Sequence, residues 1–191
     1  PCSECGTTSG RWLGKCPGCA AFGTLVEELH GSAIDAAANA ALKPVAIGAV
    51  SVEKAARIST GVAELDRVLG GGLVPGSLVL VGGEPGVGKS TLLLTALGAI
   101  ARGGGRALLV TGEESAAQVS LRAGRLGGAE SVEILAETEL ETVCATLEAE
   151  RPDVCVVDSV QTLHASALGS APGSVAQVRE AAGRLLRVAK E

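Results

Sequence analysis

Short apolar runs alternate with longer segments of mixed polarity through the last two thirds of the chain. The runs are rich in Leu, Val and Ile, which predicts strands buried on both faces, and they lie at residues 77–81, 107–111, 132–135 and 154–158. The segments between and around them repeat apolar residues every three or four positions, which predicts helices at residues 60–69, 92–101, 116–126, 139–150 and 175–190. This alternation indicates an α/β fold, a mostly parallel sheet with helices on both faces.

Helix starts in this pattern carry a second local signal. A Ser or Thr followed three residues later by Glu or Gln is a capping box, in which two side chains satisfy free backbone N–H groups. The three candidate pairs are Ser115 with Gln118, Thr138 with Glu141, and Ser174 with Gln177. Each predicts that a helix begins at the following residue.

Composition shifts divide the chain into three predicted parts. Residues 1–30 hold four of the six cysteines, and residues 31–56 are rich in Ala with few charges, as in a linker with one weak helix. Residues 57–191 carry the strand and helix alternation and form the main domain. At 191 residues, with 47% hydrophobic content and 27 glycines, the chain can bury a sizeable core.

Charge and aromatic content restrict the possible partners. The net charge is −5, and the chain has one Trp, one Phe and no Tyr. Neither a broad basic surface nor a stacking platform for nucleic acid is available, so any DNA contact must be local or made by other parts. No apolar run reaches the ~18 residues of a membrane span, and we expect no membrane partner and a cytoplasmic location.

Residues 83–90 fit the phosphate-loop pattern G-x-x-x-x-G-K-[ST]. The predicted nucleotide-binding residues are Gly83, Glu84, Pro85, Gly86, Val87, Gly88, Lys89, Ser90 and the following Thr91. The glycines let backbone N–H groups approach phosphate oxygens, Lys89 supplies a charge, and Ser90 supplies a hydroxyl for Mg²⁺. The loop stands between an apolar run and a helix pattern, as the motif requires. A chance Gly-rich turn is the alternative, and the pattern predicts a nucleoside triphosphate with Mg²⁺ as the ligand.

Acidic residues close two of the predicted strands. Asp158 ends an apolar run in the manner of a Walker B strand, whose Asp holds Mg²⁺, and Glu113 and Glu114 follow the run at 107–111. Because parallel strands gather ligands at their carboxyl ends, one of these Glu residues is a candidate general base for the attacking water. We prefer Glu113, nearer the strand end, and predict Lys89, Glu113 and Asp158 as the catalytic set. A helix N-terminal turn is the structural alternative for both Glu residues, and Gln161 is either a γ-phosphate sensor or a loop residue.

The first 20 residues contain two C-x-x-C pairs, Cys2 with Cys5 and Cys16 with Cys19. Two thiolates on each tight turn suit a tetrahedral Zn²⁺ site, and such a short module needs the metal to fold. Two disulfides are the alternative, but they require an oxidising compartment, and no secretion signal is visible. Cys144 and Cys155 lie in apolar stretches and are predicted to be packing residues.

Several blocks resemble the bacterial RadA (Sms) family of RecA-like DNA repair ATPases along nearly the whole chain. They comprise Cys2-Ser-Glu-Cys5-Gly, Trp12-Leu-Gly-Lys-Cys16-Pro-Gly-Cys19, Thr24-Leu-Val-Glu, Arg57-Ile-Ser-Thr-Gly, residues 64–77, residues 82–91, Thr111-Gly-Glu-Glu-Ser115, Asp158-Ser-Val-Gln-Thr162 and residues 171–180. A zinc module joined to this phosphate loop is more specific than either alone. The resemblance implies a RecA-like P-loop NTPase core with an N-terminal four-cysteine zinc ribbon or knuckle module.

The same resemblance implies an activity, an assembly and partners. It implies a homo-hexameric ring that binds single-stranded or branched DNA, hydrolyses ATP with a basic finger from a neighbouring subunit, and promotes branch migration beside the RecA recombinase. Residues 163–173 would be a DNA-contacting loop, for which a disordered surface loop is the alternative. We also predict Arg11, Trp12 and Lys15 as contacts of the zinc module with DNA or a partner, with a Trp12 that only covers the cysteine turn as the alternative. Family members continue with a further strand, a Lys-Asn-Arg-Phe-Gly motif and a Lon-like domain, so we expect this chain to be truncated. The competing hypothesis is a nucleotide-gated, KaiC-like regulatory module without DNA translocation.

Overall fold

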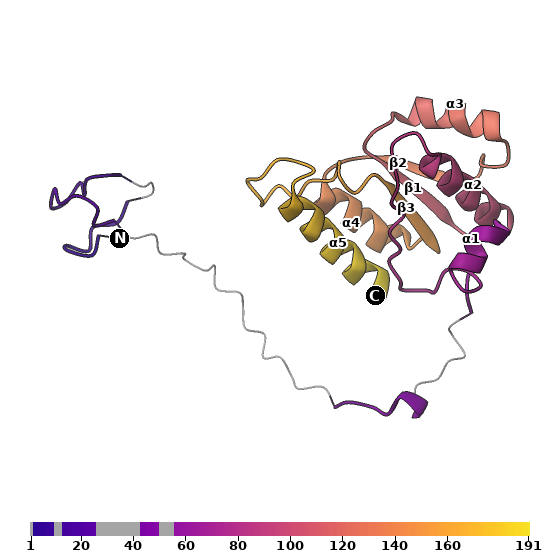
Figure 1. Cartoon of the computed structure of the whole chain (residues 1–191), viewed down its shortest axis with the longest axis horizontal. Coiled ribbons are helices and arrows are strands. Elements are labelled where there is room, and N and C mark those ends of the chain that lie inside the picture. Colours follow the sequence, from indigo (N-terminus) through magenta and orange to yellow (C-terminus); the bar gives the residue numbers. More distant parts are fainter. Residues whose placement is uncertain (1, 10–12, 26–42, 50–55) are drawn as a thin grey trace. The chain divides into compact units, whose positions relative to one another are not determined.

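The computed structural model describes residues 2–9, 13–25, 43–49 and 56–191 (Figure 1). The chain divides into two compact units, Pro1–Val50 and Ser51–Glu191. The first unit contains the four-cysteine module and a short 3₁₀ helix, η1 (Ile47–Ala49). Most of the predicted linker, residues 31–42 and 50–55, lies outside the described residues, as do Arg11 and Trp12.

The second unit is built on a parallel sheet of three strands. They are β1 (Ala107–Thr111), β2 (Glu133–Ala136) and β3 (Val154–Asp158), in the order β2-β1-β3. Leu108 of the central strand β1 pairs with Glu133 of β2 on one side and with Cys155 of β3 on the other. The predicted α/β class and parallel sheet are therefore confirmed, and three of the four predicted strands form within one residue of their predicted bounds.

Helices cover both faces of this sheet (Figure 1). The helices α2 (Lys89–Arg102) and α3 (Ala116–Leu126) cover one face, and α4 (Leu140–Glu150) and α5 (Val175–Lys190) cover the other. Side chains of a strand point alternately to the two faces, so β1 supplies both cores. Leu109 packs with the apolar side of α2, whereas Leu108 and Val110 pack with α4 and α5. Cys144 is buried in the α4 and α5 core, and Cys155 packs against its edge, as predicted for packing residues.

The predicted strand at residues 77–81 is wrong. These residues take no strand conformation, and Leu78, Val79 and Leu80 are exposed, Leu80 by 85%. An apolar run forms a strand only if a neighbouring strand accepts and donates its backbone hydrogen bonds. Among the described strands β3 pairs with β1, and no ladder joins β3 to residues 77–81. Hydrophobicity alone therefore did not place this run in the sheet.

The first helix of the unit is shorter than predicted. Helix α1 covers Ala63–Val68 and not residues 60–69. The Asp66 carboxylate accepts hydrogen bonds from the Ser59 hydroxyl at 2.6 Å and from the Thr60 N–H and hydroxyl at 2.8 and 2.7 Å. These bonds hold residues 59–62 in a turn, so the helix begins after them. Thr60 is buried within this turn.

The three predicted capping boxes had three different outcomes. Ser115 and Gln118 form the complete box at the start of α3. Ser174 accepts from the Gln177 N–H at 3.4 Å, but the Gln177 side chain points elsewhere, so only half of that box exists. The Thr138 box is wrong. Glu139 is the N-cap of α4, and the carboxylate of Glu137 accepts from the N–H groups of Thr138 and Glu139 at 2.7 and 2.9 Å.

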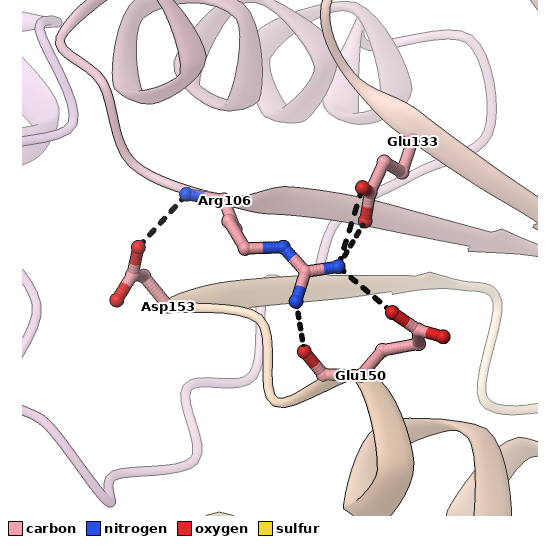
Figure 2. A network of polar contacts seen from close by, with 4 residues as sticks. All are labelled: Arg106, Glu133, Glu150 and Asp153. Atoms are coloured by element: carbon pink, nitrogen blue, oxygen red, sulfur yellow. Dashed lines mark hydrogen bonds and ion pairs between the residues drawn. The ribbon is translucent and has the colours of Figure 1, made fainter.

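A polar network ties the amino ends of the three strands together (Figure 2). Arg106 precedes β1, and its backbone N–H donates to the Asp153 carboxylate at 2.8 Å. Its guanidinium contacts the carboxylates of Glu133 at 3.2 Å and Glu150 at 2.9 Å, and it also donates to the Glu150 carbonyl. The two carboxylates raise the pKa of Arg106, with the Glu150 hydrogen bond as the larger cause. The network lies at the strand ends opposite those that carry the predicted catalytic residues.

No helix in the part of the chain that the structure describes is both long and apolar enough to cross a bilayer.

Candidate functional site

The phosphate-loop sequence forms an irregular turn that leads directly into α2. Gly86 and Gly88 have φ of +80° and +95°, in the left-handed region that glycine adopts at no steric cost. Gly88 is the N-cap of α2, and the helix begins at Lys89. The helix is fixed by its buried face of Leu94, Leu97 and Ile100 against the sheet. The N–H groups of its first turn, together with the macrodipole, are arranged to attract an anion.

Lys89 folds back over the phosphate loop. Its Nζ donates to the carbonyl oxygens of Gly83 and Glu84, both at 2.9 Å. An ammonium in this position closes the loop from one side while most of the loop remains exposed. When a phosphate binds there, Nζ would leave the two carbonyl oxygens and donate to the charged phosphate oxygens, which are stronger acceptors.

A second group of predicted residues lies at the carboxyl ends of β1 and β3. The register pairs Thr111 with Asp158, and the Gly112 N–H donates to the Asp158 carbonyl at 3.1 Å. The structure therefore brings the candidate magnesium ligand next to the turn that carries Glu113. Gly112 is required there, because a Cβ at this position would lie 2.1 Å from the Thr162 hydroxyl oxygen.

Glu113 and Glu114 have different surroundings. Glu114 is half-buried, and its carboxylate forms an ion pair with Arg122 of α3 at 2.7 Å. Glu113 is exposed, and among the described residues its carboxylate has no hydrogen bond or ion pair. Both residues line a pocket of about 300 Å³ between the ends of β1 and β2, together with Thr111, Gly112, Ser115, Ala136, Glu137 and Thr138.

The structure does not join all of the predicted site residues. Among the described residues, no hydrogen bond or ion pair links the side chains of Lys89 and Ser90 to Asp158 or Glu113, although α2 packs on both β1 and β3. Gln161 is exposed in the turn that follows β3. Residues 77–81, which lead into the phosphate loop, pair with none of the described strands, whereas Leu73 before them packs against the apolar cluster between α2 and the sheet.

The segment proposed to contact DNA, residues 163–173, is held by backbone hydrogen bonds at His164 and by the side chain of Gln177 in α5. The His164 N–H donates to the Thr138 carbonyl, and the Leu140 N–H donates to the His164 carbonyl, both at 2.9 Å. The amide of Gln177, only 1% exposed, accepts from the Ala165 N–H at 2.7 Å and donates to the Ser170 carbonyl at 2.9 Å. Sequence reasoning assigned Gln177 to a cap, and only the fold shows that its side chain is used by the loop.

The four N-terminal cysteines meet at one point in the first unit. Their Sγ atoms all lie within 4.8 Å of one another, with Cys2 3.7 Å from Cys19 and Cys5 3.6 Å from Cys16. None of the thiols is in a disulfide. Tetrahedral Zn–S bonds of about 2.3 Å require sulfur atoms about 3.8 Å apart. The cluster fits Zn²⁺ in size and in ligand type, and the disulfide alternative is not supported.

Two threonine hydroxyls contact the cysteine cluster, and sequence reasoning missed both. Thr24 Oγ1 lies 3.2 Å from the Sγ of Cys2, and Thr7 Oγ1 lies 3.2 Å from the Sγ of Cys5. The Thr24 contact is the main cause that lowers the pKa of Cys2 to about 6, and Thr7 lowers the pKa of Cys5. The sequence gives little sign of the Thr24 contact, because Thr24 reaches Cys2 only when the two ends of the module pair at Cys2 and Leu25. Lys15 of the same module has its ammonium 5.5 Å from the centre of the exposed Phe22 ring.

Each of the two units contains a match to a known protein family. A family described as rubredoxin metal binding domain matches residues 1–27, and the ATPase family described as KaiC matches residues 58–151. Three relatives named DNA repair protein RadA match the whole chain or nearly all of it. The Pseudomonas aeruginosa protein is 50% identical over 198 residues, the Brucella abortus protein 45% over 203, and the Escherichia coli protein 46% over 200. These alignments cover 100%, 100% and 99% of this chain, but 43%, 44% and 43% of the relatives. The chain thus spans less than half the length of these relatives.

Proposed function

The chain belongs to the family of bacterial proteins named DNA repair protein RadA, and on this premise we propose that it is an ATPase whose turnover is coupled to single-stranded DNA. The observation that carries the proposal is the register of β1 with β3, which sets the turn of Glu113 beside Asp158 at the carboxyl edge of the sheet. This edge is where open parallel sheets bind ligands. The phosphate-loop turn at the start of α2 supplies the second half of the site.

Each predicted residue has a role in the proposed reaction. Residues 83–91 bind the phosphates, with Lys89 leaving the carbonyls of Gly83 and Glu84 for the β- and γ-phosphate oxygens. Ser90 and Asp158 would hold Mg²⁺, which neutralises charge on the transferred phosphoryl group. Glu113 accepts the proton of the attacking water. The exposed position of the Glu113 carboxylate leaves its oxygens free for that water.

The zinc module is proposed to bind one Zn²⁺ through Cys2, Cys5, Cys16 and Cys19. The support is the fit of the four sulfur atoms to a tetrahedral site. The metal would cross-link two turns of a module too small to build a core of its own. Arg11, Trp12 and Lys15 are proposed to couple this module to DNA or to a protein partner.

The proposed assembly is a homo-hexameric ring acting in the cytoplasm on single-stranded or branched DNA, beside the RecA recombinase, in branch migration. The names of the relatives support DNA repair as the setting, and the acidic net charge of −5 favours a local DNA contact over a broad one. A basic finger from a neighbouring subunit would compensate the charge that develops on the γ-phosphate. We do not favour the KaiC-like regulator, because the match to that family covers the ATPase domain alone, whereas the RadA relatives match the zinc module as well.

ATP turnover measured with and without single-stranded DNA tests the proposal. We expect DNA to raise the rate, and the rate per protomer to rise with protein concentration if sites form between subunits. Glu113→Gln should lower turnover by about 100-fold or more and leave nucleotide binding intact. A protein that binds ATP but whose turnover ignores both DNA and protein concentration would instead be the nucleotide-gated regulator.

A further inference from the structure

The turn that follows β1 is fixed at Glu114 by its backbone. The Thr111 hydroxyl donates to the Glu114 carbonyl at 3.0 Å and accepts from the Glu114 N–H at 3.1 Å. Thr111 is itself buried at the end of β1, so the strand end holds Glu114 in one place. Immediately afterwards, Ser115 and Gln118 cap α3 and fix the direction in which the chain leaves.

The Glu114 side chain is fixed as well. Its carboxylate lies 2.7 Å from the guanidinium of Arg122, two turns along α3, with the side chains 35% and 20% exposed. The Nε of Arg122 is buried and has no partner among the described residues. The Arg122 side chain is partly buried, and among the described residues the ion pair with Glu114 is the polar contact of its guanidinium, so this pair holds Arg122 in place.

Glu113 is the unattached member of this turn. Between two fixed neighbours, Gly112 packed against Thr162 and Glu114 held by Arg122, its exposed carboxylate lines the 300 Å³ pocket. A general base must both receive and release a proton in each cycle, and its position must be set by its surroundings. Glu113 meets both requirements, since the residues around it are fixed while its own oxygens are free.

We propose that Glu113 and Glu114 divide the work of this site, with Glu113 as the catalytic carboxylate and Glu114 and Arg122 as a positioning pair that fixes the turn from which Glu113 projects. The inference rests on the proposed ATPase function and deepens it. It assigns a role to Arg122, which no sequence motif indicated.

Four variants of the intact protein test this division, each assayed for ATP turnover and for binding of a fluorescent ATP analogue. Glu113→Gln should lower kcat by about 100-fold or more, the range of general-base catalysis, with nucleotide affinity within about threefold of wild type. Glu114→Gln and Arg122→Met should each lower kcat by about 10-fold while leaving KM nearly unchanged, because a shifted turn misplaces the base without altering the phosphate loop. Arg122→Lys should recover part of the lost kcat.

The double variant Glu114→Gln/Arg122→Met isolates the pair. If the two residues act as a unit, its kcat should be no lower than that of the worse single variant. Arg125→Met, an exposed arginine on the same helix, is the matched control and should leave kcat unchanged.

Either of two results would overturn this inference and leave the proposed function standing. One is loss of turnover in Glu114→Gln with turnover retained in Glu113→Gln. The other is an Arg122→Met protein with wild-type kcat. A wild-type protein that shows no ATP turnover at any DNA concentration would overturn the proposed function, and the inference with it.

Discussion

The side-chain oxygen of Gln177 accepts a hydrogen bond from the Ala165 N–H at 2.7 Å, and both groups are buried. The amide nitrogen of the same side chain donates to the carbonyls of Ala165, Leu168 and Ser170, the last at 2.9 Å. One side chain of α5 thus binds four backbone groups of the loop that joins β3 to α5. The Ser166 hydroxyl adds a bond to the Glu139 carboxylate at 3.0 Å, and the loop carries no charged side chain between residues 165 and 173.

Gln177→Leu should release this loop. The substitution keeps the volume but leaves the Ala165 N–H and several carbonyls without partners, at a cost of about 1–3 kcal/mol for the buried donor. We expect faster hydrogen exchange at Ala165 and faster proteolysis within residues 166–173. Gln118→Leu, which disturbs only the start of α3, is the control. Equal exchange rates at Ala165 in the two variants would contradict the role given to Gln177.

Lys89→Ala should weaken nucleotide binding. The ammonium supplies charge-assisted hydrogen bonds worth about 1.5–3 kcal/mol, so affinity for ATP should fall by about 10- to 100-fold and turnover by more. Titration with a fluorescent ATP analogue measures the first effect. Lys190→Ala, a lysine at the end of α5, should bind as wild type does. Normal ATP binding by Lys89→Ala would show that the phosphate loop is assigned wrongly.

Thr24→Val should weaken zinc binding without removing a ligand. In the structure the Cys2 thiol donates to the Thr24 hydroxyl oxygen at 3.2 Å, and the Thr24 hydroxyl donates to the Ala21 carbonyl at 3.5 Å. Once zinc replaces the thiol proton, the Thr24 hydroxyl can turn to donate to the thiolate, and loss of such an outer contact typically lowers metal affinity by about 10- to 100-fold. Competition against a chromogenic chelator gives the affinity directly. Thr8→Val, at an exposed threonine of the same module, is the matched control. If metal analysis finds no zinc in wild-type protein purified under reducing conditions, the metal assignment itself fails.

Asp66→Asn should lower stability at neutral pH. The Ser59 hydroxyl, followed by the Thr60 N–H and hydroxyl, holds the pKa of Asp66 below its ordinary value of 3.8. A lowered folded-state pKa contributes stability that is fully present above the ordinary pKa and is lost as the pH falls through the lowered one. The difference in Tm between wild type and Asp66→Asn should therefore be largest at neutral pH and shrink below about pH 4.

An exposed glutamate provides the comparison for Asp66. Glu64 pairs with Arg67 at the surface of α1, with its side chain 79% exposed, so Glu64→Gln should change Tm little at any pH. A difference between wild type and Asp66→Asn that stays constant from pH 7 to pH 3 would show that Asp66 acts through shape and not through charge.

The sequence by itself determined the features that depend on local pattern. Alternating apolar runs and helical segments predicted the α/β class, the three paired strands and the helices on both faces, because burial on both sides of a sheet imposes that pattern on neighbouring residues. The paired C-x-x-C motifs predicted a four-thiol cluster, because each motif carries its own turn geometry. The phosphate-loop pattern likewise predicted a turn that ends at a helix start.

Tertiary structure alone decided which groups meet. The run at residues 77–81 has the composition of a strand, yet it is not one, because a ladder requires a partner that composition does not specify. Gln177 reads as a capping residue, but its amide finds four backbone partners in a loop that precedes it. The sequence favoured Glu113 over Glu114 by its position alone, and the approach of Arg122 from α3 gives the two carboxylates different surroundings. Such contacts join residues distant along the chain, so they follow from packing and cannot be read from local spacing.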